Sequence, residues 1–182
     1  MKKFNLLKIS IFSLLLTAMM PVALRAQDND DKDKLLNDAS NARDQFIKAD
    51  SLMKTMFDHS VGYVIFPNVG KGAIGVGGAA GNGILYEHGT PVGKAKMKQV
   101  TVGFQFGGQA YREVIFFEND AALQQFKTGN YALSAQASAV AVTKGAATNI
   151  KYRNGVMIFT QEKGGLMYEA AVGGQKFGYT PF

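Results

Sequence analysis

The chain of 182 residues contains no cysteine and only two histidines, His59 and His88. The absence of cysteine excludes disulfides and lipid attachment to a cysteine, and leaves no thiolate to complete a metal site with the histidines. The sequence also lacks the motifs G-x-x-x-x-G-K-[ST], H-E-x-x-H and G-x-S-x-G. We therefore expect no enzyme: no catalytic residue, no metal and no cofactor, and no nucleic-acid partner.

One formal cofactor motif is present but lies in the wrong context. Gly75 to Ala80 matches G-x-G-x-x-A, the fingerprint of a dinucleotide site. Gly81-Asn82-Gly83 follows where a helix should begin, and no acidic residue lies about 20 positions further on. A dinucleotide site is therefore not expected.

The N-terminus has the three parts of a signal peptide. Lys2, Lys3 and Lys8 precede an apolar run from Ile9 to Thr17, and Ala26 ends a plausible cleavage site. We expect residues 1–26 to be a signal peptide, residues 27–33 a mobile start and residues 34–182 a single domain. The protein is then exported, and is periplasmic or secreted after cleavage near Ala26.

Charge is distributed unevenly along the chain. The formal net charge is +6, but four of the basic residues lie in the expected signal peptide, which leaves +2. Residues 28–58 are net acidic, whereas the segment from His59 onward is net basic. A basic body favours phosphates or an anionic membrane surface, although the same pattern also serves solubility alone.

A long helix is expected from Lys34 to Phe57. Its apolar residues recur at alternating spacings of four and three, which places them on one face of a helix: Leu35, Ala39, Ala42, Phe46, Ala49, Met53 and Met56. Asp31 or Asp33 can cap its start. The stripe predicts a core contact, with insertion into a membrane surface as the alternative.

Glycine is concentrated in the middle of the chain. Residues 70–108 hold 12 of the 21 glycines. An apolar strand, Val61 to Phe66, precedes them, and Pro67 is expected to stop it. One interpretation is a curved and bulged sheet with close backbone contacts. The other is a surface whose backbone N–H groups bind anions. The glycines of this candidate surface are Gly70, Gly72, Gly75, Gly77 and Gly78.

The remaining segments predict further strands and one short helix. Glu87 to Pro91 is expected to turn. A strand over Gln99 to Gly107 should bury Val100, Val102, Phe104 and Phe106, and further strands are expected at 109–118, 131–143, 150–160 and 166–172. Asn119 should cap a short helix ended by Gly129, and Asn154-Gly155 predicts a type I′ turn. The fold class is therefore α+β: a long N-terminal helix packed on a curved, glycine-rich, mainly antiparallel β-sheet of about six to eight strands, with one further short helix.

Several basic residues are candidate phosphate ligands. Lys94, Lys96 and Lys98 alternate and would share one face of a strand, where they either attract phosphates or protect an edge strand from pairing. Lys71 lies among glycines and could hold a phosphate with nearby N–H groups, or be a solvated turn lysine. Lys151 and Arg153 share a face before the Asn154 turn and most simply form a solvated surface.

Several motifs in their order resemble the SYLF domain family. They are V-I-F-P-x-V-x-K-G at Val64 to Gly72, G-F-Q-F-G-G-Q at Gly103 to Gln109, the short helix entered at Asn119, and E-K-G-G-L at Glu162 to Leu166. The resemblance extends from about Lys34 to Val172. It implies a module that binds phospholipids or phosphoinositides; the actin role of the family's eukaryotic members is not carried over.

By position, the resemblance implies Lys71 and Lys163 as basic contact residues. Where the family often has Gly-Pro, this chain has Val140 to Gly145, which makes Lys144 a possible substitute contact. We expect a peripheral binder of anionic phospholipid head groups, with Lys71, Lys94, Lys96, Lys98, Lys144 and Lys163 as the binding residues. The alternative is a structural cell-envelope protein that contacts a protein partner through its sheet surface.

Overall fold

A computed structural model describes residues 29–74, 76–102, 109–134, 138–145, 147, 151–163, 169–171 and 174–182. The chain divides into two compact units, Met1–Lys34 and Leu35–Phe182. Of the first unit, residues 29–34 are described, and they are helical. The expected signal peptide lies outside the described residues. The second unit carries the sheet and the candidate binding residues.

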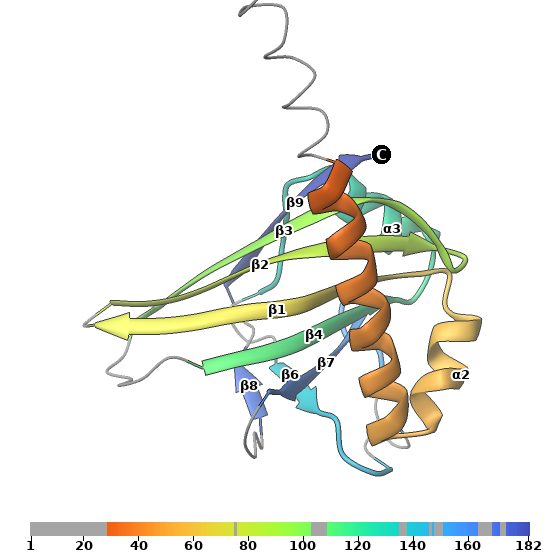
Figure 1. Ribbon diagram of the computed structural model, residues 1–182, viewed down its shortest axis with the longest axis horizontal. Coiled ribbons are helices and arrows are strands. Elements are labelled where there is room, and N and C mark those ends of the chain that lie inside the picture. The colour runs from red at the N-terminus through yellow and green to blue at the C-terminus, as the bar shows by residue number, and fades with distance from the viewer. Residues whose placement is uncertain are drawn as a thin grey trace, which may run out of the picture. The chain divides into compact units, whose positions relative to one another are not determined.

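The core of the second unit is one sheet of nine described strands, in the order β5-β9-β3-β2-β1-β4-β7-β6-β8 (Figure 1). All neighbours pair antiparallel except β6 and β7, which are parallel. This confirms the expected α+β class. The strands are β1 (Gly62–Ile74), β2 (Val76–Glu87), β3 (Thr90–Val102), β4 (Gln109–Phe117), β5 (Tyr131–Ala132), β6 (Ser138–Ala141), β7 (Val156–Glu162), β8 (Glu169–Ala171) and β9 (Gln175–Pro181).

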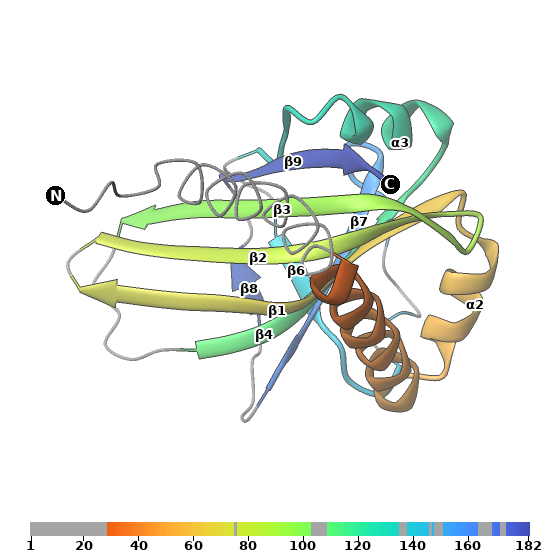
Figure 2. The same cartoon turned by 45° about the horizontal axis from the view of Figure 1, so that its top comes forward.

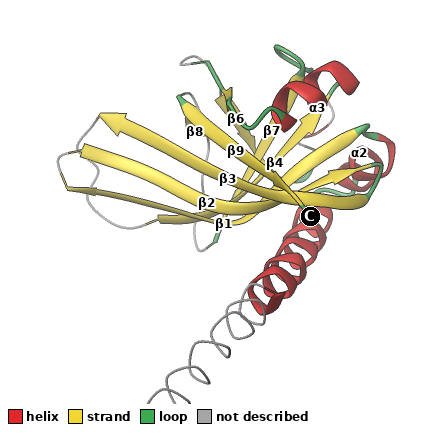
Figure 3. Ribbon diagram, turned by 90° about the horizontal axis from the view of Figure 1, so that it is seen from above, coloured by secondary structure: helices red, strands yellow, loops and turns green. Residues whose placement is uncertain are grey.

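Helices lie on both sides of this sheet (Figure 3). A long helix runs over residues 29–49. Its part within the second unit, residues 35–49, packs with α2 (Leu52–His59) on one side, which we call the long-helix side. The short helix α3 (Asp120–Lys127) packs on the other, the α3 side. The long-helix side buries Ala39, Ala42, Phe46, Met53, Phe57, Tyr63, Ile65, Ile84, Val114, Phe116 and Phe159. The expected apolar stripe of the long helix is therefore core.

The expectation of a single helix from Lys34 to Phe57 is wrong, because the helix is interrupted at Asp50 and Ser51. The buried Asp50 carboxylate accepts one hydrogen bond from the Leu52 N–H at 3.1 Å and another from the Ala147 N–H at 3.0 Å. These bonds hold the corner between the long helix and α2. Asp31 and Asp33 lie inside the long helix, so neither caps its start.

Pro67 does not stop β1, contrary to the sequence expectation. The pairing of β1 shifts between Ile65 and Asn68 on the β2 side and between Phe66 and Val69 on the β4 side. Such a bulge removes the residue that lacks an N–H from the regular ladder. β1 therefore continues to Ile74 as one central strand.

The side-chain phase expected after Lys98 is also wrong. Gln99 is buried and Val100 is 73 % exposed, because β3 is one continuous strand whose alternation is set by the buried Ala95 and Met97. A one-residue difference in phase moves every side chain to the other side of a sheet. Phe104 and Phe106 lie outside the described residues.

The C-terminal half departs from expectation in two places. The strand expected at 131–143 is two short strands at opposite ends of the sheet, since β5 pairs with β9 and β6 pairs with β7. β9 itself was not expected as a strand. The Asn119 cap is confirmed by its side-chain bond from the Ala122 N–H at 3.0 Å. The Asn154-Gly155 turn is confirmed by positive φ at both residues, 52° and 77°.

The close contact of β2 with β1 generates a stability prediction at Gly83. A Cβ added there would lie 2.5 Å from the Ile65 carbonyl oxygen and 2.7 Å from the Phe66 ring, so neighbouring backbone must shift. We expect Gly83→Ala to lower the free energy of unfolding by about 1 to 3 kcal/mol in a denaturant titration. Gly70 has no atom within 4 Å of an added Cβ, so Gly70→Ala should be neutral or slightly stabilising. Equal losses in both variants would contradict the close-contact argument.

Candidate functional site

The three alternating lysines of β3 lie on the long-helix side of the sheet. Lys96 and Lys98 are exposed and Lys94 is half-buried, whereas Ala95 and Met97 between them are buried on the α3 side. β3 pairs with β2 on one edge and with β9 on the other. The interpretation of these lysines as protection for an edge strand is therefore wrong, because β3 is an interior strand.

Neighbouring strands extend the lysine positions into rows across the sheet. In one row Lys96 pairs with Asn82, which pairs with Asn68. In the next, Lys176 pairs with Lys98, Lys98 with Ala80, and Ala80 with Gly70. All of these side chains or positions are exposed. We call this surface the lysine face, made of Asn68, Gly70, Ala80, Asn82, Lys96, Lys98, Val100, Ala110 and Lys176.

No described helix covers the lysine face. Strands β1, β2 and β3 run well past the long helix, and their far ends carry these rows (Figure 2). Between the lysines the residues are small or amide-bearing, so the surface is shallow. None of its nine residues is acidic. A planar anionic surface can therefore approach the strands closely.

Lys176 is a candidate site residue that the sequence analysis missed. It lies directly opposite Lys98 in the β3–β9 ladder, and both are exposed. Like charges directly opposite one another destabilise a sheet. The sequence carries little indication of this position, because Lys176 reaches the lysine face only through the pairing of β9 with β3.

Lys163 lies at the border of the lysine face. It follows β7, and its backbone N–H donates to the Ala110 carbonyl at 2.9 Å. Its ammonium group donates to the Asn68 side-chain oxygen. Burial lowers the pKa of Lys163, as does the nearby Arg112 guanidinium, while Asp38 opposes both effects. The structure thus joins Lys163 to the Asn68–Asn82–Lys96 row.

The candidate glycines divide between the two sides of the sheet. Gly70 belongs to the lysine face and Gly78 pairs with Val100, whereas Gly77 is buried. Gly72 pairs with Gly78 in the β1–β2 ladder, and Gly75 lies outside the described residues. Strand pairing uses the backbone N–H groups of interior strands. None of the candidate glycines is among the described positive-φ glycines, which are Gly89, Gly129, Gly145, Gly155 and Gly174.

The other candidate cations are not brought onto the lysine face by strand pairing. Lys71 pairs with Ala79 and Gln109, in a rung between those of Gly70 and Gly72; its side chain lies outside the described part of the structure. Lys144 is exposed in the segment after β6, and β2, β1, β4 and β7 separate β6 from β3. Lys151 and Arg153 are exposed before β7. Their roles in binding stay predictions.

The chemistry offered by the lysine face is electrostatic. Ammonium groups attract phosphates without fixing a geometry, and the exposed Val100 adds an apolar contact beside them. Within the described residues no cluster of three or more metal-ligating side chains occurs. None of the described helices has the length and apolar character needed to span a membrane.

A known protein family matches a part of the chain that carries four of the nine residues of the lysine face. The model of the family described as "Ysc84: Las17-binding protein actin regulator" matches residues 98–178. The matched segment starts at Lys98 and includes Lys144, Lys163 and Lys176. Lys71, Lys94 and Lys96 precede it. The SYLF/Ysc84 family is not known as a family of enzymes.

A curated relative extends the likeness. The chain is 29 % identical over 127 residues to a protein named "Beta cell expansion factor A" from Aeromonas veronii. The aligned part covers 68 % of this chain and 48 % of that protein. The chain therefore spans about half the length of the curated relative it matches.

The Lys98–Lys176 pair generates a second stability prediction. Lys176→Glu replaces two like charges by an opposite-charge pair, so we expect the thermal midpoint to rise by roughly 1 to 3 °C at low salt. The gain should shrink at high salt, because exposed charges are screened. Lys144→Glu makes the same charge change away from this pair and should shift the midpoint less. A fall in the midpoint of Lys176→Glu would contradict the pairing.

Proposed function

We propose that this chain binds the anionic head groups of phospholipids at a membrane surface, without catalysis. The match of residues 98–178 to the Ysc84 family model supports a binding function. The family description names protein binding and actin regulation. The resemblance to SYLF domains implies lipid binding. Binding is therefore the general function that the family supports. The choice of anionic phospholipid rests on the lysine face.

The observation that carries the proposal is the arrangement of Lys96, Lys98 and Lys176. Three exposed ammonium groups lie on neighbouring interior strands, with only small or amide side chains between them. Each lysine near an anionic membrane surface contributes about 1 kcal/mol of attraction. The Lys98–Lys176 repulsion costs stability in the free protein, and an anionic surface would relieve it.

Val100 gives the same surface a second kind of contact. It is 73 % exposed and lies one rung beyond Lys98 on β3. An apolar side chain at the edge of a cationic patch can enter the boundary between head groups and acyl chains. This combination favours a membrane surface over a dissolved phosphate as the partner.

A vesicle-binding experiment tests the proposal. The chain from Gln27 is used, because the apolar run Ile9 to Thr17 would bind lipid by itself. We expect co-sedimentation with anionic vesicles at low salt, weaker binding at high salt, and none with zwitterionic vesicles. Replacing Lys96, Lys98 and Lys176 by glutamine should weaken the apparent affinity roughly 100-fold, from about 1 kcal/mol per lysine.

The control removes the same charge elsewhere. The variant Lys48→Gln, Lys151→Gln, Arg153→Gln neutralises three exposed cations outside the lysine face. It should keep most of the vesicle affinity. Equal losses in the two triple variants would mean that overall charge, not this face, drives binding.

The competing function is a protein contact made by the same sheet surface. The family description, which names a Las17-binding protein, motivates this candidate. Salt-insensitive capture of a protein partner, together with no binding to either kind of vesicle, would favour it over lipid binding.

Export is part of the proposal, because an exported chain meets membrane surfaces from outside the cytoplasm. The basic start, the apolar run and Ala26 support it. The mass of the protein recovered from the cell envelope or the medium should correspond to a chain that begins at or near Gln27. An unprocessed mass in the cytoplasm would overturn this part of the proposal.

A further inference from the structure

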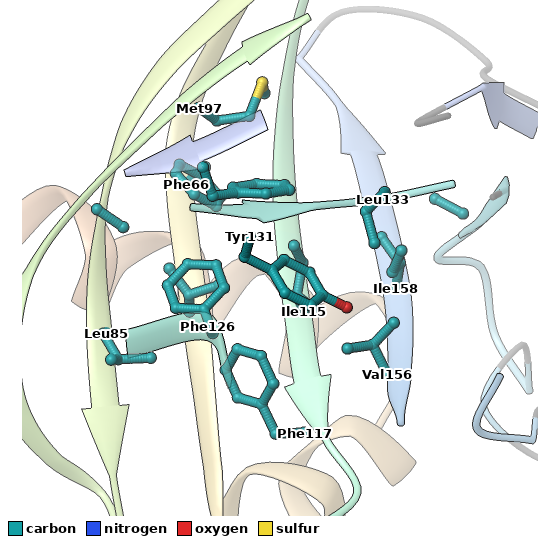
Figure 4. Close-up of a cluster of buried hydrophobic side chains, with 14 of the residues drawn as sticks. Phe66, Leu85, Met97, Ile115, Phe117, Phe126, Tyr131, Leu133, Val156 and Ile158 are labelled. Carbon is teal, nitrogen blue, oxygen red and sulfur yellow. The ribbon is translucent and has the colours of Figure 1, made fainter. Parts of the chain in front are cut away.

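The α3 side of the sheet buries polar side chains within an otherwise apolar core. Figure 4 shows aromatic and aliphatic side chains gathered there, among them Phe66, Phe126 and Tyr131. Glu113, Thr160 and Gln175 are fully buried on the same side, and Gln99 is 4 % exposed. Glu113 is the acid of this group, and the proposed function does not use it.

Glu113 is bonded to a strand that is remote from its own in the sheet. The Gln175 side-chain N–H donates to Glu113 Oε2 at 3.0 Å. Glu113 lies on β4 and Gln175 on β9, and the strands β1, β2 and β3 lie between β4 and β9 in the sheet order. The rings of Phe66 on β1 and Phe177 on β9 also meet, with centroids 5.7 Å apart. The sheet therefore curls, and the Glu113–Gln175 bond ties β9 to β4 across the curl.

Two oxygens of this pair lack a hydrogen-bond partner among the described residues. They are Glu113 Oε1 and Gln175 Oε1, and both are buried. If Glu113 is ionised, both oxygens are acceptors and no hydrogen is available between them. A neutral carboxylic acid carries one O–H, which can donate to Gln175 Oε1. One proton then satisfies both oxygens and completes a pair of hydrogen bonds between the acid and the amide.

The surroundings disfavour a negative charge at Glu113. Thr160 faces it from β7 and Phe66 from β1, through the ladder pairs of β4. The titratable groups near it on this side include Tyr111 on β4, whose phenol interacts with the Gln175 side chain, and Tyr131 on β5. Glu162 of β7 pairs with Tyr111. Burial raises the pKa of Glu113 to about 7, against a smaller lowering by the Gln175 hydrogen bond; no neighbouring charge is among the causes.

We propose that Glu113 is a proton-operated latch: as a neutral acid it closes the curl through two hydrogen bonds with Gln175, and loss of its proton to solvent releases β9 from β4. The released state has a carboxylate that must reach water, and β9 lies next to the edge of the sheet with only the two-residue β5 beyond it. β9 is thus the element that can move.

The sign of the pH dependence follows from the direction of the shift. The folded protein holds this proton more tightly than the unfolded chain, whose glutamate titrates at its ordinary value of 4.5. The latch contributes fully below the unfolded pKa. Its contribution declines as the pH rises from 4.5 to about 7, and is lost above the folded pKa.

The test is the thermal midpoint of the full chain against pH, with Glu113→Gln as the key variant. For the wild type, Glu113 should lower the midpoint by roughly 3 to 5 °C per pH unit between about pH 5 and 7. Glutamine keeps both hydrogen bonds without a titrating proton. Glu113→Gln should therefore lose this slope and be more stable than the wild type at about pH 8. Glu118→Gln changes an exposed glutamate and should keep the wild-type slope.

Two further readouts make the outcome decisive even if Glu113→Gln folds poorly. In the wild type, the carbon-13 resonance of the Glu113 carboxyl should titrate near pH 7, and a midpoint near its ordinary value of 4.5 would overturn the proposal. Amide hydrogen exchange in β9, corrected for its intrinsic pH dependence, should be faster at about pH 8 than at about pH 6. An unchanged slope in Glu113→Gln, or equal exchange at both pH values, would also overturn it. None of these measurements involves lipid, so they are independent of the proposed function.

Discussion

The alternation of side chains along β3 is the constraint on which both sides of this protein depend. β3 lies between β2 and β9, and from Gly93 to Gln99 its backbone pairs on both edges. Ala95, Met97 and Gln99 enter the core on the α3 side, and this fixes Lys96, Lys98 and Val100 on the other. The lysine face is thus a direct result of how the core is packed.

The glycines and small residues of β1 and β2 serve this arrangement in two ways. Where backbones approach closely, as at Gly83, they let the sheet curl tightly enough for β9 to reach β4. Where they lie on the lysine face, as at Gly70 and Ala80, they keep the surface shallow between the cations. Both effects arise because the side chains at these positions are absent or small. The many glycines here therefore determine the shape of the sheet and its surface more than they make the backbone flexible.

Much of the fold could be predicted from local patterns, and the failures share one cause. Three features depend on neighbours in the chain and are present as expected: the apolar stripe of the long helix, the Asn119 cap and the Asn154-Gly155 turn. The break at Asp50 depends on Ala147, and the phase of Gln99 depends on a core that distant strands complete. Lys176 is recognised only once β9 is placed beside β3. Each of these three misses depends on a contact between residues far apart in sequence.

The strands that form the lysine face use backbone N–H groups for pairing, which limits how selectively this face can bind a ligand. β1, β2 and β3 each have a partner on both edges, so their N–H groups point along the ladders and not toward a ligand. A ligand meets ammonium tips on flexible stems, which carry charge but little directional geometry. For the proposed function, such a face distinguishes membranes by how densely negative charge is spread across them, and is indifferent to the stereochemistry of any single head group.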